Sequence, residues 1–207
     1  MSIMSRLKSA TADLHRDAES SPLQSQLVKG LLPRDGYVSF LGQMYLIHTA
    51  MEQAIRAVTD KHPGFAAVLR DYHWRESQLR ADLVFLGTDP GTIAPATATT
   101  AMVAEIERAI DEQPVTLLGM LYVMEGSTNG SKFIAAAIRK AYELVGPGTS
   151  YLDPHGELQK QRWQAFKSDM DGVGFDEAES LAIITAAKGV FRGLTDLSEE
   201  LYQPVSV

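Results

Sequence analysis

The residues of this sequence that could hold a metal-containing ligand lie near its N-terminus, at helical spacing. His15 is followed four residues later by Glu19, so on a helix both side chains lie on one face. An imidazole that binds a metal commonly donates its second ring N–H to such a carboxylate, which fixes its tautomer and orientation. Lys8 precedes His15 by two turns, about 10 Å along a helix axis. The alternative is a solvated, charged helix face, which the spacing does not exclude.

A second unusual feature is a pair of glycines inside a long apolar stretch, residues 115–144. Pro114 suits the first turn of a helix, and a Gly-Pro-Gly sequence at 146–148 ends it. Gly126 and Gly130 are four residues apart and therefore share a face of that helix. Each costs about 1 kcal/mol relative to alanine. Either another helix packs closely against them, or a flat ligand lies against bare backbone.

The other four histidines each have a structural interpretation. His48 falls in an apolar stripe and is expected to be a hydrogen-bonded core residue. His62 and His155 lie beside prolines, which favours surface loops, and His73 lies on a charged helix, where it is expected to be solvated. The sequence contains no Glu-x-x-His, His-Glu-x-x-His or Gly-x-Ser-x-Gly motif. Carboxylate-bridged di-iron, zinc protease and serine hydrolase sites are therefore unsupported.

Hydrophobic periodicity predicts helices throughout, with no alternating runs typical of strands. Asp176 with Glu179 resembles a capping box that starts the last helix. The sequence predicts an all-α fold of about eight helices. The longer predicted helices are residues 3–20, 34–59, 65–86, 100–111, 115–144 and 158–170, and a last one from 176 to about 201.

Composition narrows the class of protein. The chain has 207 residues and no low-complexity linker, so we expect a single domain over 1–207. Its net charge of −7 argues against general nucleic-acid binding. The absence of cysteine excludes disulfides and thiolate-bound metals. No apolar run suits a signal peptide or a membrane span, so a cytoplasmic location without membrane attachment is expected.

Several motifs occur together along this chain. The first is Leu7-Lys8-x-x-Thr11-x-x-x-His15-x-x-x-Glu19, followed by RDGY at 34–37 and YLIH at 45–48. The second is Tyr122, Glu125-Gly126-Ser127 and Gly130 within residues 118–144. Ala81-Asp82-Leu83, Leu86-Gly87 and Trp163-x-x-Phe166 extend the pattern. Taken together, these residues resemble the heme oxygenases, especially the bacterial type.

The resemblance implies the multi-helical heme oxygenase fold, with heme between the first helix and a kinked distal helix. His15 would bind the iron as a neutral imidazole oriented by Glu19. Gly126 and Gly130 would lie over the distal face of the heme. Ser127 stands where animal members have an aspartate that orders a water. The other residues expected to contact heme are Lys8 and Lys167 at the propionates, Tyr122, and Phe191 in the distal pocket.

The activity implied is cleavage of heme by O2 and reductant to biliverdin, CO and ferrous iron. Lys8 is retained and Ala137 stands where a regiochemically different subgroup has lysine, which favours cleavage at the α-meso carbon. Because no flavin or nicotinamide motif is present, electrons would come from a separate reductase or ferredoxin. Biliverdin would serve iron acquisition or supply a phytochrome. The alternatives are a non-catalytic heme or bilin carrier, which Ser127 keeps open, and a thiaminase-like hydrolase, which the lack of cysteine disfavours.

Overall fold

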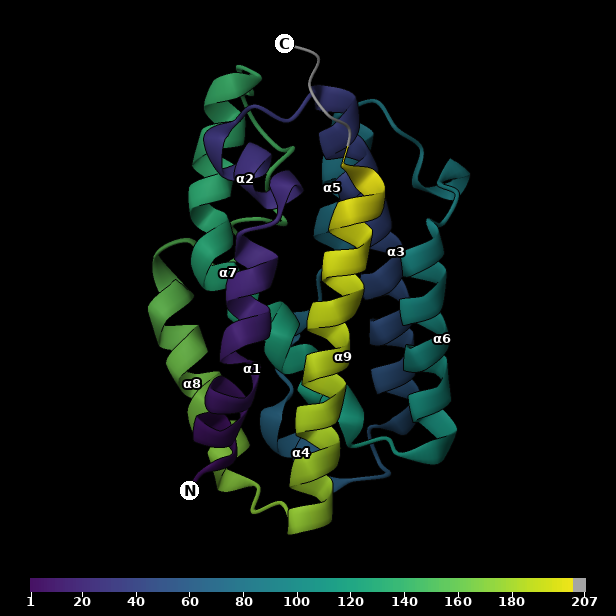
Figure 1. The fold of residues 1–207 in the computed structure, drawn as a ribbon, viewed down its shortest axis with the longest axis vertical. Coiled ribbons are helices and arrows are strands. Elements are labelled where there is room, and N and C mark those ends of the chain that lie inside the picture. Colours follow the sequence, from purple (N-terminus) through teal and green to yellow (C-terminus); the bar gives the residue numbers. More distant parts are fainter. Residues whose placement is uncertain (203–207) are drawn as a thin grey trace.

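The chain folds into a bundle of helices, as a computed structural model shows for residues 1–202 (Figure 1). No strand forms within these residues, which confirms the predicted all-α class. The α-helices are α1 (Ile3–Glu19), α2 (Pro22–Lys29), α3 (Arg34–Val58), α4 (Pro63–Val68), α5 (Glu76–Phe85), α6 (Thr97–Glu112), α7 (Thr116–Ala141), α8 (Gln159–Gly172) and α9 (Glu177–Leu201). Three short 3-10 turns lie at Asp71–His73, Pro90–Thr92 and Gly156–Leu158.

Helix α9 is the element against which most of the bundle packs. It contacts α1, α2, α3, α6 and α7 (Figure 1). It begins with the predicted capping box: Asp176 accepts from the Glu179 backbone N–H, and Glu179 accepts from that of Asp176. The contact with α7 is closest at Gly119, where a Cβ atom would lie 2.1 Å from the Ile183 carbonyl oxygen. Only glycine therefore fits at this crossing of two backbones.

Helix α1 buries one side of its first two turns. Ser2 caps it by accepting from the Ser5 backbone N–H, and Leu7 is fully buried. Its last two turns are more open, and His15 and Glu19 remain exposed. The first half of the helix therefore anchors the second half, which carries the polar residues, against the bundle.

The prediction of one helix over residues 65–86 is wrong. The chain leaves the helical region after Val68: Leu69, Arg70 and Trp74 are all extended, and α5 begins at Glu76. This break brings His73 and Arg75 into the interior, where their side chains are almost fully buried. Tertiary burial therefore overrides a local helical pattern here.

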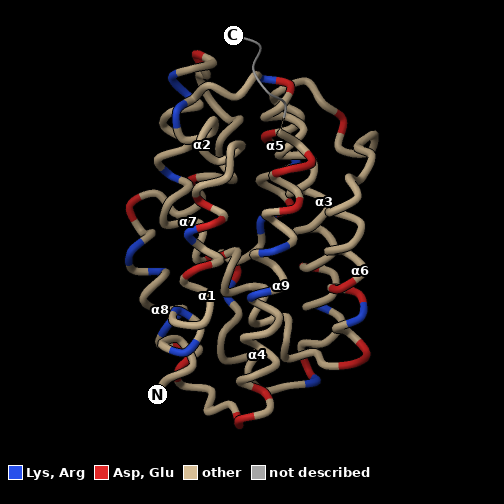
Figure 2. The backbone as a smooth tube through the Cα atoms, in the orientation of Figure 1, with Lys and Arg blue, Asp and Glu red and all other residues tan. Residues whose placement is uncertain are grey.

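Charged residues of both signs are spread along the outer helices (Figure 2). Helix α7 contrasts with them, since it carries one charged residue, Glu125, between Thr116 and Ser131. Of the helices in the described part of the chain, none combines the length and apolarity needed to cross a membrane.

Candidate functional site

A cavity of about 1040 Å³ opens between α1, α7, α8 and α9. All nine residues singled out in the sequence line it, although they come from four helices. Helix α1 supplies Lys8, His15 and Glu19; α7 supplies Tyr122, Gly126, Ser127 and Gly130; α8 supplies Lys167 and α9 supplies Phe191. The fold thus brings the two sequence motifs to opposite walls of one cavity.

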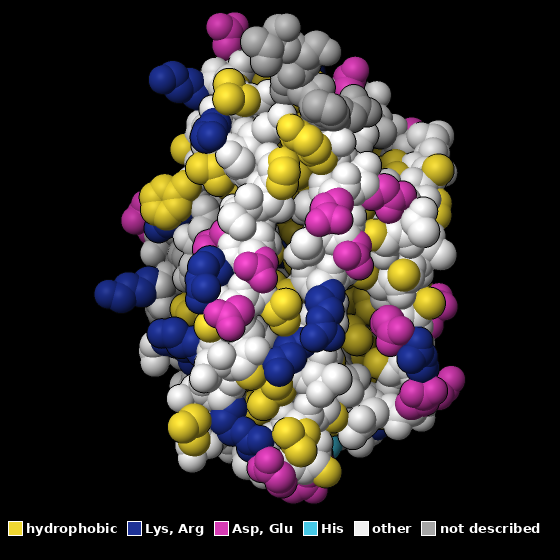
Figure 3. Space-filling view, in the orientation of Figure 1, with side chains coloured by type: hydrophobic (Ala, Val, Ile, Leu, Met, Phe, Trp, Pro, Cys, Tyr) yellow, Lys and Arg dark blue, Asp and Glu magenta, His cyan; other side chains and the backbone are white. Residues whose placement is uncertain are grey.

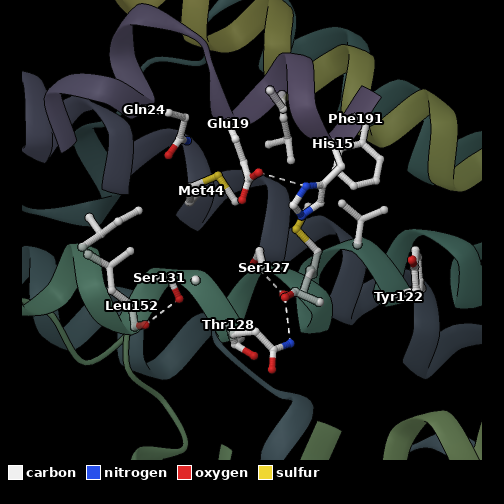
Figure 4. A pocket seen from close by; sticks show the side chains of 18 of the residues that line it. His15, Glu19, Gln24, Met44, Tyr122, Ser127, Thr128, Ser131, Leu152 and Phe191 are labelled. Carbon is white, nitrogen blue, oxygen red and sulfur yellow. Dashed lines mark hydrogen bonds and ion pairs between the residues drawn. The ribbon is translucent and has the colours of Figure 1, made fainter. Parts of the chain in front are cut away.

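His15 presents one ring nitrogen to this cavity. Its Nδ1 lies 3.3 Å from Glu19 Oε2, the expected i,i+4 pair. Figure 4 shows His15 and Glu19 pointing from α1 into the space above Ser127 on α7. The His15 and Phe191 rings pack in a T-shaped arrangement, with 5.7 Å between the centroids. The expectation that Phe191 lies in the distal pocket is therefore wrong, because its ring lies beside His15 (Figure 4). If Nδ1 carries the proton that faces the Glu19 carboxylate, Nε2 has the lone pair that a metal can take.

The wall opposite His15 has bare helix backbone at Gly126 and Gly130. A Cβ atom at Gly130 would meet no heavy atom within 4 Å, and one at Gly126 would meet only Trp163, at 3.5 Å. These glycines therefore do not serve close helix packing, which was one of the two interpretations of their cost in helix stability. They leave open the space that side chains would otherwise fill.

Helix α7 also bends at this point. In Figure 1 its first half passes obliquely behind α1, and its second half turns upright beside α2. Three successive side chains, Ser127, Thr128 and Asn129, donate to the carbonyl groups three residues before them, at 2.7, 2.6 and 3.0 Å. Such bonds compete with the helical ladder and bend helices. The glycine at 126 adds backbone freedom at the same place.

The remaining predicted residues lie around these two walls. Lys8 is exposed, and Lys167 is partly buried. Tyr122 is partly buried and packs against Trp163, with ring centroids 6.0 Å apart. Ser127 is exposed, and its hydroxyl already donates to the Met124 carbonyl, so it is free to accept a hydrogen bond from the cavity.

Three of the histidine interpretations are wrong. His73 is 1 % exposed rather than solvated, and burial lowers its pKa to about 4. His62 is largely buried, lies 3.0 Å from Glu179 Oε1 and stacks on Phe175. His155 is 5 % exposed. Proline neighbours predicted loops correctly for these segments, but the loops pack against the helices and bury the rings.

The expected core position of His48 is confirmed, and it also lines the cavity. Its Nε2 lies 3.3 Å from the hydroxyl of Tyr151, a second cavity residue that the sequence did not reveal. Burial lowers the pKa of His48 to about 3 and raises that of the Tyr151 phenol. Both groups are therefore neutral at the back of the cavity.

Sequence reasoning also missed a buried polar cluster beside α7. Glu125 Oε1 accepts from Arg75 Nη2 at 2.7 Å, and Oε2 lies 3.2 Å from His155 Nε2. Arg162 Nη1 lies 2.9 Å from the other ring nitrogen of His155. A signal existed: Glu125 continues the buried spacing of Leu118 and Leu121, where an ionised carboxylate needs partners.

The residues present fit a heme. The cavity is mostly apolar, the exposed imidazole of His15 faces it from α1, the opposite wall lacks side chains at Gly126 and Gly130, and two lysines line it. Within residues 1–202 no group of three or more His, Cys, Asp or Glu side chains could hold a metal ion by itself. A single histidine suffices where the remaining ligands belong to a porphyrin.

Comparison with known proteins agrees with this geometry. The family model described as heme oxygenase matches residues 1–200. Heme oxygenase 1 of Homo sapiens is 26% identical over 205 residues, which cover 95% of this chain and 70% of that protein. Heme oxygenase 1 of Synechocystis sp. is 22% identical over 195 residues, or 92% of this chain and 81% of its relative.

Solved structures share the fold over nearly the whole chain. The heme oxygenase from Leptospira interrogans superposes with a TM-score of 0.89 at 25% identity, covering 97% of this chain and 100% of that one. Heme oxygenase-1 from Synechocystis, solved in complex with heme, also gives a TM-score of 0.89, at 21% identity and with 97% and 92% coverage. With the model match across residues 1–200 and a cavity that fits heme, the chain belongs to the heme oxygenase family.

Proposed function

We propose that this protein is a heme oxygenase, which uses O2 and reductant to convert heme to biliverdin, CO and ferrous iron. The observation that carries the proposal is the pair of facing walls: an imidazole oriented by a carboxylate on α1, and a wall of α7 without Cβ atoms at Gly126 and Gly130. When bound, heme supplies the O2 and electron-transfer chemistry. The protein supplies binding, orientation and exclusion of competing reactions.

Each wall has a separate task in this proposal. His15 holds the iron through Nε2, and Glu19 fixes the ring by accepting from Nδ1. Phe191 limits rotation of the ring by packing on its edge. Across the cavity, Gly126 and Gly130 would allow the backbone of α7 to approach a bound heme. Ser127, whose hydroxyl donates to the Met124 carbonyl oxygen, could accept a hydrogen bond from a water there, in place of an aspartate.

The orientation of the heme is assigned to the lysines at the cavity edge. Lys8 on α1 and Lys167 on α8 both line the cavity and would pair with the two propionates. This anchoring favours cleavage at the α-meso carbon. The nearby Lys132 does not line the cavity, and its Nζ lies over the Phe133 ring, 5.2 Å from the centroid.

Electrons come from a separate protein in this proposal, a reductase or ferredoxin. Figure 3 shows Lys and Arg side chains over α1, α8 and α9 on one face, with carboxylates among them. An acidic donor would meet this face close to the heme edge. Biliverdin would then serve iron acquisition or pass to a phytochrome, in the cytoplasm.

Titration with hemin followed by reduction in air tests the proposal. We expect a sharp Soret band that saturates at one heme per chain. Ascorbate and O2, with catalase present to remove free peroxide, should then replace it with the broad red absorbance of biliverdin. A Soret band that persists under both ascorbate and a protein electron donor would instead identify a heme carrier. No binding of hemin would reject both.

A further inference from the structure

The bent segment of α7 has little to hold it from the cavity side. A Cβ at Gly130 would touch nothing, and Ser127 is exposed to the cavity. The hydrogen bonds of the Ser127, Thr128 and Asn129 side chains to preceding carbonyl groups lie within the segment itself. They therefore bend the helix without fixing the position of the segment relative to the other helices. The distance between this wall and His15 must therefore be set from another side.

Two buried residues attach the segment to the rest of the fold, and at its end the partly buried Ser131 donates to the Leu152 carbonyl oxygen at 2.6 Å. Glu125 receives Arg75 at 2.7 Å and lies 3.2 Å from His155. One turn later, Thr128 Oγ1 accepts from Gln159 Nε2 at 2.8 Å. At about 100° per residue, the midpoint of this pair lies roughly 150° around the helix from that of Gly126 and Gly130. The centre of the attachment therefore lies well around the helix from the open wall, although Thr128 and Arg75 also border the cavity.

The partners of Glu125 are themselves held in place. The Arg75 backbone N–H donates to Glu52 on α3, and its Nη1 donates to the Tyr72 carbonyl oxygen. His155 is held through both ring nitrogens: Nδ1 lies 2.9 Å from Arg162 Nη1 on α8, and Nε2 lies 2.9 Å from Arg75 Nη2 and 3.2 Å from Glu125 Oε2. The charges of Arg75 and Glu125 are 3% and 5% exposed, so solvent screens them little. Such a pair tolerates little displacement.

We propose that Glu125, held by Arg75 and His155, is a positioning residue that sets the height of the Gly126–Gly130 wall above the heme. The inference rests on the heme site of the proposed function. Glu125 does not line the cavity and takes no part in the chemistry. It acts through the backbone of α7, and its loss lets the wall move.

The first test uses the protein without heme. In Glu125→Gln, which keeps the shape but loses the charge, backbone amides of residues 122–132 should exchange with deuterium at least tenfold faster than in the native protein. Amides of α6 should be unchanged. An exposed ion pair of α1 and α9, removed by Glu177→Gln, is the matched control and should leave residues 122–132 unchanged. Equal exchange in native protein and Glu125→Gln, or acceleration spread evenly over the chain, overturns the proposal.

The second test measures how much space the α7 wall leaves for a ligand on the heme iron. The hemin complex of Glu125→Gln should show a changed ratio of affinities for azide and for the larger imidazole, by at least threefold. His155→Gln keeps a polar side chain beside Glu125 and Arg75 and should stay near the native ratio, whereas His155→Leu should shift it. An unchanged ratio in both Glu125→Gln and His155→Leu contradicts the proposal. Failure of the native protein to bind hemin would reject the proposed function instead, and the exchange experiment would still decide the role of Glu125.

Discussion

Helix α7 uses glycine in two opposite ways within a dozen residues. At Gly119 a Cβ atom would lie 2.1 Å from a carbonyl oxygen of α9, so two helix backbones touch there. At Gly130 a Cβ atom would meet nothing within 4 Å, and at Gly126 it would meet only the edge of Trp163. Packing of α7 on α9 requires Gly119, whereas Gly126 and Gly130 leave space in the cavity. All three are glycines within one helix, and only their surroundings show that the fold requires the first.

This contrast separates stability from function along one helix. The Gly119 crossing joins α7 to α9, the helix that most of the bundle contacts. The Gly126–Gly130 segment faces His15 across the cavity. Substitutions at the crossing should therefore act on folding, and substitutions at the open wall should act on heme chemistry with the fold intact.

The largest expected effect on stability is that of Gly119→Ala. Its methyl group cannot be placed without moving a backbone carbonyl of α9, and overpacking of this kind costs about 1–3 kcal/mol or more. We expect a fall of about 3 kcal/mol in the free energy of unfolding, measured by urea denaturation of the heme-free protein. The control is Gly130→Ala, which should raise stability by up to about 1 kcal/mol because alanine favours helix and has room. Equal stability of the two variants would remove the contrast.

Gly126→Leu should leave stability nearly unchanged and impair heme chemistry, the opposite of what is expected for Gly119→Ala. Its side chain enters the cavity opposite His15, where it would occupy the space above the heme. We expect the free energy of unfolding to stay within about 1 kcal/mol of the native value, while biliverdin formation driven by ascorbate falls at least tenfold or shifts to other products. Normal turnover would mean that the wall does not lie close to the heme.

A smaller effect is expected from the buried cavity residue His48 under acid. Burial lowers the pKa of His48 to about 3 from its usual value near 6.5, so the unfolded chain binds a proton more readily. Stability due to this group is complete above pH 6.5 and is lost as the pH falls towards 3. His48→Gln should flatten that acid loss in thermal unfolding of the heme-free protein. Equal curves for native and His48→Gln protein would contradict this.

The smallest expected effect is on product identity rather than rate. Lys8 is exposed at the cavity edge, so Lys8→Asn should leave folding unchanged. If its charge holds a propionate and thereby sets the rotation of the heme, chromatography of the products should show biliverdin isomers other than α. An identical isomer mixture would assign no orienting role to Lys8.

The sequence predicted those features that depend on local spacing. Helical periodicity and the capping box at Asp176 were sufficient for α1, α3, α7 and α9, because each buries a continuous stripe. The pairing of His15 with Glu19 follows from i,i+4 geometry and is present at 3.3 Å. The meeting of these residues with Gly126 in one cavity was expected only from resemblance, since no local rule joins positions 111 residues apart.

The features that were missed depend on contacts between distant segments. His73 and Arg75 look like residues of a solvated helix, and the chain breaks that helix to bury them against Phe166 and Glu125. His155 lies in a loop that folds onto α7, so loop position did not imply exposure. Gly119 was not distinguished from its neighbours because its requirement comes from a carbonyl group of another helix.

The central claim is that His15 binds the iron of heme opposite a wall of bare backbone, and its most direct test is absorbance of the hemin complex of His15→Ala. We expect this variant to fold, to lose the native Soret position and to form no biliverdin. Free imidazole, which can enter the space left by the ring, should restore the native spectrum. A His15→Ala complex with the native spectrum and turnover, in the absence of imidazole, would contradict the claim.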